Sequence, residues 1–293
     1  VTHEQQSLVW LASPLLGGVR HGFSTRRGGV SPAPWDTLNL GPGRGDAPEN
    51  VEENYRRFFA ALDMDSAYPV LSRQVHRDDV RLCTAADAGK GLIRDRDYDA
   101  DALITAEKGL PLVVFSADCG ILLLHDPDAG CVGAVHAGWR GCAAGIVEKT
   151  VREMVRLLGA RPERILAAVG PCIGKCCFET DGDVPEAMRA SALGPEAEPY
   201  LERRGPKYHV DLAGLNRQWL LHAGVAPEHI DICGLCTAFG NLRTKANRAV
   251  DLLNSDPFAV FQREQRVHQA IHGVDVRNRD SPGRNIQHLS HRC

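Results

Sequence analysis

The sequence of 293 residues predicts a layered α/β (α+β) sandwich, and three observations support this prediction. Four short strand candidates follow one another between residues 102 and 136, and the helical patterns stand in separate blocks before and after them. No Gly-x-Gly-x-x-Gly motif follows a strand candidate, and no Gly-Lys-Ser/Thr loop is present. The pattern therefore argues against a doubly wound nucleotide fold.

The N-terminal part is predicted to begin with loops and short strands, because its first 45 residues are rich in glycine and proline. A helix is predicted over residues 46–62, where Pro48 stands near the start and apolar residues recur at helical spacing. Residues 70–75 and 80–83 are predicted to be two strands that pair with each other.

The middle of the chain contains most of the regular patterns. Strands are predicted over residues 102–105, 112–117, 121–125, 131–136, 165–169, 209–212 and 229–233. The clearest helix is predicted over residues 143–158, where the apolar residues form one stripe and Gly159 follows as a C-terminal cap. A second helix is expected over residues 215–222.

We predict a single domain over residues 1–240 and a divergent extension over residues 241–293. Regular strand and helix signals fade after Phe239, and the chain contains no internal repeat. One helix is expected over residues 257–270, and the extension is expected to pack weakly or atypically.

The composition is that of a globular protein, with 43% hydrophobic and 24% charged residues. The net charge of −3 and the pI of about 6.5 give no indication of nucleic-acid binding. The longest apolar runs are too short to span a bilayer, and the start of the sequence does not read as a signal peptide. We therefore expect no membrane partner. The sequence contains no signal for an oligomeric state.

The chain has 10 cysteines, a proportion well below that of a disulfide scaffold. Several of them lie in apolar or small-residue stretches, where a cysteine packs as a buried thiol. We therefore expect a reducing, cytoplasmic compartment.

One thiol and two imidazoles form a candidate metal site. Cys119 and His136 lie 17 positions apart, each at the end of an apolar run, and His76 is a third donor from a separate segment. Thiolate and imidazole donors suit zinc or copper, and three protein ligands leave one position open, as in catalytic zinc sites. The alternative from spacing alone is a buried thiol, a hydrogen-bonded His136 and a surface His76.

The residues beside these candidate ligands favour a catalytic role over a purely structural one. Arg140 has the planar donors that suit phosphate, although a surface ion pair is the simpler interpretation. Trp139 is able to stack on a purine ring, and core packing is its alternative. Asp118 precedes the thiol as a candidate orienting group or proton carrier, and a turn-forming aspartate is its alternative.

Seven stretches resemble the bacterial YfiH-like proteins, which are also called laccase-domain or polyphenol oxidoreductase proteins. They are His21-Gly-Phe-Ser-Thr-Arg26 with Gly28-Gly29-Val30-Ser31, Leu38-Asn39-Leu40-Gly41, Gln74-Val75-His76, Ala117-Asp118-Cys119, Val135-His136-Ala-Gly-Trp-Arg-Gly141, Gly170-Pro-Cys-Ile-Gly174 with Cys177-Phe178-Glu179, and Cys236-Thr237. They occur in the family's order and cover residues 20–238. The His-Ala-Gly-Trp-Arg-Gly run is the most specific of them.

The resemblance implies an α/β/β/α fold and one open metal site formed by His76, Cys119 and His136, with Zn²⁺ bound or Cu²⁺ as the alternative. It implies phosphorolysis of adenosine, inosine, guanosine and methylthioadenosine, together with adenosine deamination. The expected partners are therefore a purine nucleoside and phosphate. We assign catalytic roles to Asp118, Cys119 and His136, and we assign substrate binding to Arg26, Asn39, Gln74, Trp139 and Arg140.

Two departures from the family pattern stand out. The family usually has an apolar residue and then proline after Ala-Asp-Cys, where this chain has Gly120-Ile121. The family's Phe-Phe-Ser-x-Arg-Arg and Thr-Gly-Arg stretches are absent after Cys236. The first departure changes the loop and keeps the ligand, whereas the second removes an arginine-rich end.

Three other functions are open alternatives. A Cys-His₂ donor set also suits a blue-copper centre and hence phenol oxidation, although no His-x-His pair of a multicopper enzyme is present. Cys233 and Cys236 form a C-x-x-C pair that Cys172, Cys176 and Cys177 could join in a structural zinc or redox site. Cys119 with His136 would also suit a cysteine hydrolase. The usual zinc deaminase signature is absent, so deamination would need a different arrangement.

Overall fold

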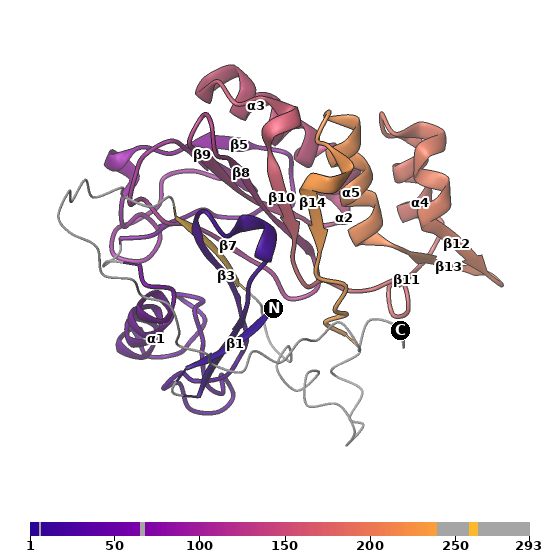
Figure 1. The fold of residues 1–293 in the computed structure, drawn as a ribbon. Helices are drawn as coiled ribbons and strands as arrows, with labels where there is room; N and C mark the ends of the chain where they lie inside the picture. Colours follow the sequence, from indigo (N-terminus) through magenta and orange to yellow (C-terminus); the bar gives the residue numbers. More distant parts are fainter. Residues whose placement is uncertain (6, 65–67, 239–257, 263–293) are drawn as a thin grey trace.

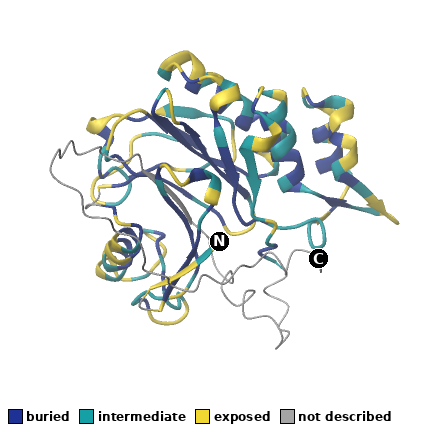
Figure 2. Ribbon diagram, viewed as in Figure 1, coloured by how far each residue is buried: buried dark blue, intermediate teal, exposed yellow. Residues whose placement is uncertain are grey.

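Two six-stranded sheets lie face to face at the centre of the protein, and helices cover their outer faces (Figure 1). The computed structural model describes residues 1–5, 7–64, 68–238 and 258–262. Buried residues gather in the two sheets and on the inner sides of the helices (Figure 2). The predicted layered α/β/β/α fold with mixed sheets is thereby confirmed.

The first sheet has the strand order β1-β2-β3-β15-β7-β4. Its strands are β1 (Thr2–Gln5), β2 (Leu8–Leu11), β3 (Arg20–Ser24), β15 (Phe258–Gln262), β7 (Leu112–Phe115) and β4 (Val70–Leu71). The second sheet has the order β14-β10-β8-β9-β6-β5. Its strands are β14 (Ile230–Ile232), β10 (Leu166–Val169), β8 (Gly120–Asp126), β9 (Cys131–Ala137), β6 (Ala102–Thr105) and β5 (Val80–Leu82).

The remaining elements surround these sheets. A small third sheet has the order β11-β13-β12, formed by β11 (Glu179–Thr180), β13 (Lys207–Val210) and β12 (Leu201–Arg204). The α-helices are α1 (Pro48–Ala61), α2 (Trp139–Ala143), α3 (Ile146–Leu158), α4 (Asp183–Ala190) and α5 (Leu212–His222). Short 3₁₀ helices cover Pro14–Leu16, Ala85–Asp87, Pro162–Arg164, Gly194–Tyr200 and Pro227–His229.

Alternation along the central strands assigns their side chains to different core layers. In β8, Ile121 and Leu123 pack between the two sheets, whereas Leu122 and Leu124 pack toward the outer helices. Val113 of β7 faces away from the other sheet and packs in the cluster that α1 covers. Because β8 and β9 are buried on both faces, most of their residues are apolar, which explains the apolar runs of the sequence.

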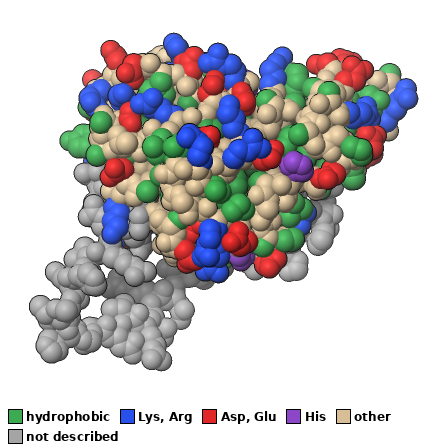
Figure 3. Space-filling model, turned by 90° about the horizontal axis from the view of Figure 1, so that it is seen from above, with side chains coloured by type: hydrophobic (Ala, Val, Ile, Leu, Met, Phe, Trp, Pro, Cys, Tyr) green, Lys and Arg blue, Asp and Glu red, His purple; other side chains and the backbone are tan. Residues whose placement is uncertain are grey.

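The outer face of α3 is charged and exposed. Glu148 pairs with Arg152 at 2.8 Å and Glu153 pairs with Arg156, both along the helix surface. On the face seen in Figure 3, basic and acidic side chains are interspersed. Among the described residues, no helix is both long and apolar enough to cross a bilayer.

Four element predictions need correction. The strands expected over 70–75 and 80–83 do not pair with each other, because β4 pairs with β7 in the first sheet and β5 pairs with β6 in the second. The helix expected over 143–158 begins at Ile146, because Gly145 has a left-handed φ of 77° that separates α2 from α3.

The other two corrections concern the later part of the chain. The strand expected over 209–212 is β13, which ends at Val210, and Leu212 already begins α5. Phe258–Gln262, expected in a helix over 257–270, form β15, which pairs antiparallel with β3 and β7. Residues 241–257 and 263–293 of the predicted extension lie outside the described residues.

Strand direction brings several loops to one edge of the first sheet. β3 and β7 both run antiparallel to β15 between them, and β4 runs parallel to β7. The segments that leave the carboxyl ends of β3, β4 and β7 therefore emerge at the same edge. These segments contain Arg26, His76 and Cys119.

Candidate metal centre

His76, Cys119 and His136 come together at this edge. Their ligand-type atoms all lie within 4.8 Å of one another. The two imidazole rings meet edge to face, with centroids 4.9 Å apart and an interplanar angle of 87°. His76 follows β4, Cys119 immediately precedes β8, and His136 lies near the end of β9. The three donors thus come from three segments that are distant in sequence.

The β8–β9 hairpin determines where the thiol and His136 lie. Gly120 pairs with Ala137 and Ile121 pairs with His136, so Cys119 stands beside Gly138 at the end of the ladder. A Cβ atom added at Gly138 would lie 2.9 Å from Cys119 Sγ and 3.2 Å from His76 Cδ2. The close approach of the thiol and the imidazole therefore requires glycine at position 138.

Burial divides the cluster into a closed side and an open side. His136 is buried, Cys119 is half-buried and His76 is exposed. The neighbouring Asp118 and Arg140 are exposed as well. A small molecule would therefore approach the cluster from the side of His76.

Asp101, which the sequence analysis missed, organises the cluster. This fully buried carboxylate accepts a 2.8 Å hydrogen bond from His136 Nδ1. It also accepts the backbone N–H groups of Val75, His76 and Arg77 at 3.0–3.1 Å. The backbone N–H of His136 donates in turn to the backbone carbonyl of Asp101 at 2.7 Å. One residue therefore orients His136 and shapes the turn that presents His76, whose φ is 61°.

A signal for Asp101 was present in the sequence. Asp99 and Asp101 stand directly before the strand that begins at Ala102. An acidic residue that enters a buried strand needs a partner in the core. Nothing local in the sequence identifies that partner as His136, which is 35 positions away.

The pKa values of the two imidazoles are shifted in opposite directions. Burial by itself lowers the pKa of His136, but the hydrogen bonds to Asp101 and Cys119 and the charge of both groups outweigh it and raise this pKa to about 9. Burial, followed by the positive charge of His136, lowers the pKa of His76 despite the attraction of Asp101. At neutral pH, His76 is therefore neutral, and in the absence of a cation His136 holds a proton.

The pKa of Asp101 is also displaced. Burial by itself raises it, but hydrogen bonds from His136 and from the amides of Arg77 and Val75 outweigh burial and lower the pKa. The Asp101 carboxylate is therefore ionised at neutral pH. Because Nδ1 of His136 is bound to this carboxylate, Nε2 is the nitrogen left for the thiol or for a cation.

The two residues after Gly138 lie at the rim. The Arg140 guanidinium stacks on the Trp139 ring at 4.2 Å, and the Trp139 side chain also packs against the core under the outer helices. The positive charge of Arg140 is among the causes that lower the pKa of His76, which places Arg140 near the cluster. One side of the indole is thus in the core and the other is under a cation.

Three other predicted site residues are held by neighbouring groups. The Asp118 carboxylate accepts the Thr237 hydroxyl at 2.6 Å. The Gln74 amide makes two 2.7 Å hydrogen bonds with the backbone N–H and carbonyl of Phe115. The Asn39 amide donates to Asp46 at 3.0 Å. In these contacts, Gln74 ties the turn before His76 to the end of β7, and Asn39 stabilises its own loop.

Arg26 lies at the same edge as the cluster, with β15 between its strand and β7. Phe23 and Val114 both pair with Ala259, so Arg26 and Ala117 stand at equivalent distances beyond β3 and β7. Because β15 lies between β3 and β7, two strand spacings, or about 10 Å, separate β3 from β7. The Arg26 Nε atom donates to the Asp36 carbonyl at 2.7 Å. Among the substrate-binding predictions, Arg140 is thus a cation near the cluster, and Arg26 is a second cation at the same edge, about two strand spacings away.

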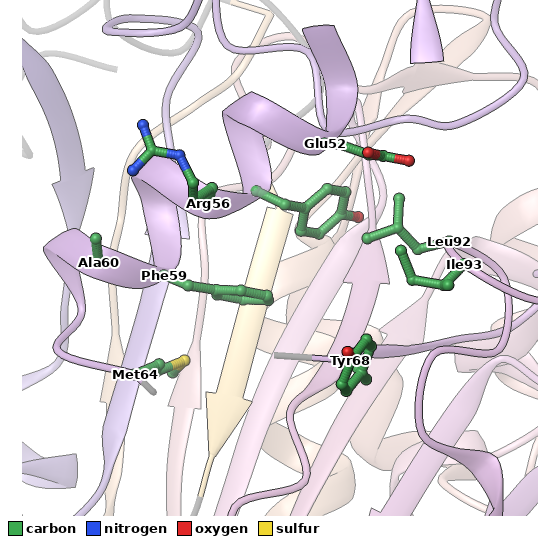
Figure 4. Close-up of a pocket in the computed structure, with 9 residues that line it drawn as sticks. Glu52, Arg56, Phe59, Ala60, Met64, Tyr68, Leu92 and Ile93 are labelled. Carbon is green, nitrogen blue, oxygen red and sulfur yellow. The ribbon is translucent and has the colours of Figure 1, made fainter. Parts of the chain in front are cut away.

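A cavity of about 410 Å³ lies elsewhere, between α1 and the turn at residues 89–93 (Figure 4). Its lining is mainly aromatic and apolar, with Tyr55, Phe59 and Tyr68 as the largest side chains. None of the residues predicted for catalysis, metal binding or substrate binding lines this cavity. The cavity therefore adds nothing to the candidate metal centre.

Residues 20–243 match the protein family described as multi-copper polyphenol oxidoreductase laccase. A purine nucleoside phosphorylase of Deinococcus radiodurans is 46% identical over 218 residues, which cover 74% of this chain and 80% of that protein. The purine nucleoside phosphorylase YfiH of Escherichia coli is 41% identical over 212 residues, which cover 72% of this chain and 82% of YfiH.

Solved structures show the same architecture. The crystal structure of the hypothetical protein YfiH of Bacillus licheniformis superposes with a TM-score of 0.79 at 29% identity, covering 90% of this chain and 99% of that one. The crystal structure of YlmD from Geobacillus stearothermophilus gives a TM-score of 0.74 at 30% identity, covering 90% and 98% of the two chains. The similarity therefore extends over almost the whole length of both structures.

Proposed function

The chain belongs to the multi-copper polyphenol oxidoreductase laccase family, with YfiH and YlmD among its relatives, and on this premise we propose that it is a metal-dependent purine nucleoside phosphorylase. The observation that carries the proposal is the convergence of His76, Cys119 and His136 on one open point. Relatives that carry the name purine nucleoside phosphorylase support the choice of reaction.

The donor set fits a zinc ion. Zinc–nitrogen and zinc–sulfur bonds of the usual length place tetrahedral ligands about 3.5 Å apart. The three donor atoms lie within 4.8 Å of one another, so small side-chain movements would suffice. Asp101 supports His136 as a carboxylate supports a metal-bound histidine. Cu²⁺ is the alternative cation for the same donors.

We assign the metal to His76, Cys119 and His136 Nε2, with one position left for an oxygen atom of the substrate or water. When bound, zinc supplies Lewis-acid polarisation of that oxygen. The protein's own residues then have three tasks. They hold phosphate, orient the nucleoside and provide a proton for the departing base.

In phosphorolysis, a phosphate oxygen bonds to C1′ of the ribose, the C1′–N9 bond breaks, and the purine leaves with a proton. We propose that Arg140 and Arg26 hold the phosphate, because Arg140 lies near the cluster, Arg26 follows β3 at the same edge, and a planar guanidinium suits phosphate oxygens. For Arg140 this requires the guanidinium to leave the Trp139 ring, which frees the indole face for a purine.

Asp118 is the proposed proton carrier. It is exposed, it precedes the thiol ligand, and it receives a hydrogen bond from Thr237 that holds its carboxylate in place. Adenosine, inosine, guanosine and methylthioadenosine are the proposed substrates. Adenosine deamination, in which water replaces the amino group at C6 and ammonia is released, is a second reaction that we propose for the same centre.

The test is phosphate-dependent release of adenine from adenosine by zinc-loaded protein. Arg140→Ala is expected to reduce kcat/KM, whereas Arg152→Ala, which removes an exposed arginine from α3, is the matched control. Inosine formation without phosphate would instead identify deamination. Turnover of neither kind, by protein that carries zinc at His76, Cys119 and His136, would refute the proposed function.

Phenol oxidation is the second candidate, favoured by the donor set and by the description of the matching family. It predicts oxygen uptake with a phenol when the protein is loaded with copper. The same assay, run with adenosine and with a phenol in the presence and absence of phosphate, separates the two activities.

A cysteine hydrolase that needs no metal, with the Cys119 thiol as its nucleophile, is the third candidate. His136 interacts with both Cys119 and Asp101, the order of groups that a cysteine nucleophile requires. This mechanism predicts activity that resists chelators and is lost on alkylation of Cys119. Loss of activity with a chelator, and its return with zinc, would exclude it.

A further inference from the structure

A second group of sulfur atoms lies in the segments that contact Asp118 through Ile173 and Thr237. Cys176, Cys177 and Cys236 place their Sγ atoms within 4.8 Å of one another, and those of Cys176 and Cys177 are 3.5 Å apart. None of the three is in a disulfide. Three sulfurs around one metal ion at the usual zinc–sulfur distance would be about 3.8 Å apart. The observed spacing is therefore close to that of a metal-thiolate centre.

The backbone builds this group from two distant segments. Cys176 and Cys177 lie in a turn that the Gly174 carbonyl closes by accepting the N–H groups of Cys177 and Phe178, both at 2.9 Å. Cys236 is brought beside this turn by an isolated parallel bridge with Cys172. Because both segments are held by backbone contacts, the three sulfurs are preorganised.

A backbone donor and a cation lie beside these sulfur atoms. The Gly174 N–H donates to Cys236 Sγ at 3.2 Å, as amides do to metal-bound sulfur. The pKa of Arg204 is raised first by its hydrogen bond to Glu202 and also by the charge of Cys176, which places a cation near this sulfur. A Cβ at position 174 would lie 3.2 Å from Cys176 Sγ and 3.4 Å from Cys236 Sγ, so glycine leaves the space between the sulfurs clear.

Geometry and burial exclude two nearby cysteines from this group of sulfur atoms. Cys172 and Cys233, which the sequence analysis considered with Cys236, do not join the three sulfurs. Burial raises the pKa of Cys172 far above its ordinary value and that of Cys233 to about 11. Both therefore remain protonated thiols near neutral pH, which corrects the C-x-x-C interpretation of Cys233 and Cys236.

We propose that Cys176, Cys177 and Cys236 bind one thiophilic cation, of the class that includes Zn²⁺ and Cu⁺, as a second metal centre separate from the one at His76, Cys119 and His136. On binding, each S–H proton passes to the buffer as a metal–sulfur bond forms, and no oxidation occurs. Cys176 and Cys177 are half-buried, so a cation reaches them without unfolding of the chain.

Two hydrogen bonds to Asp118 link the segments of the two centres. Thr237, which follows Cys236, donates to Asp118, which precedes Cys119. The Ile173 N–H also donates to the Asp118 carbonyl at 2.8 Å. A metal ion bound at the sulfur centre would thus hold the segments of Ile173 and Thr237, which both contact Asp118. The second centre would therefore position Asp118 beside the first centre.

The experiment counts bound metal in fully reduced protein under anaerobic conditions, with Zn²⁺ in one arm and Cu⁺ in the other. Wild type is expected to bind about two equivalents and the Cys176→Ser/Cys177→Ser double variant about one. Cys233→Ser, which changes a nearby half-buried thiol outside the cluster, is the matched control and should keep the wild-type value.

A second measurement isolates the new centre from the proposed function. In His76→Ala protein, metal is expected to slow alkylation of Cys176 and Cys177 at least about tenfold, read by peptide mass spectrometry. Unchanged alkylation, or equal stoichiometry in wild type and the double variant, would overturn the proposal. So would a disulfide among these cysteines that persists after treatment of the protein with a reductant. None of these outcomes depends on nucleoside turnover.

Discussion

Asp101 accepts a hydrogen bond from His136 Nδ1 at 2.8 Å, and this contact joins the residue that precedes β6 to the candidate metal centre. The same carboxylate receives three consecutive amides around His76. Two of the three proposed ligands are therefore positioned by one buried residue that has no role in the sequence pattern of the site.

Asp101→Asn is expected to weaken zinc binding about 10- to 100-fold, because an amide supports a metal-bound imidazole less well than a carboxylate does. The measurement is competition with a chromophoric chelator. Asp99→Asn is the control, since Asp99 forms ion pairs with Arg73 and Arg77 near the surface, whereas Asp101 holds His136. Equal affinity in the two variants would show that Asp101 does not orient the ligand.

Gly138→Ala is expected to disturb the metal centre, because its Cβ would lie 2.9 Å from Cys119 Sγ. Overpacking of this kind costs about 1–3 kcal/mol, and relief of the contact would move the thiol away from His76. Metal stoichiometry and thermal unfolding report the two effects. Gly18→Ala should change neither, because its Cβ would meet nothing within 4 Å.

Zinc affinity is expected to increase with pH between about 7 and 9. The pKa of His136 in the metal-free protein is about 9, so a cation that binds below this pH must displace a proton from the ring. Because the Cys119 thiol must also lose its proton on binding, each unit of pH should change the affinity at least about tenfold, and the contribution of His136 should diminish above about pH 9. Calorimetry in buffers of different ionisation enthalpy measures the released protons, and no proton release at pH 7 would contradict the prediction.

Asn54→Ala is expected to destabilise the protein by about 2–4 kcal/mol, because it removes one side chain that satisfies several buried groups. Asn54 is fully buried, accepts the Val30 N–H at 2.8 Å and donates to the Asn39 carbonyl at 2.8 Å. Denaturant unfolding gives the free energy. Asn50→Ala should cost less than Asn54→Ala, because it removes only one partly buried hydrogen bond, to Asp46.

Much of the fold was predictable because its signals are local. The apolar runs of β7, β8 and β9 and the apolar stripe of α3 follow from periodicity, and these elements appear close to their predicted positions. The pairing of strands was less accessible. β4 and β5 are close in sequence yet belong to different sheets, because the turn between them is held by Asp101 rather than by a hairpin ladder.

By itself, the sequence determined which donors the chain can offer and the strand ends at which His76, Cys119 and His136 stand, because side-chain chemistry and hydrophobic periodicity are properties of neighbouring residues. Only the tertiary structure decided that Asp101 supports His136, and that Cys236 joins Cys176 and Cys177 rather than Cys233. Both pairings link segments far apart in the chain. They depend on sheet register and on the need of buried polar groups for partners, neither of which a local pattern encodes.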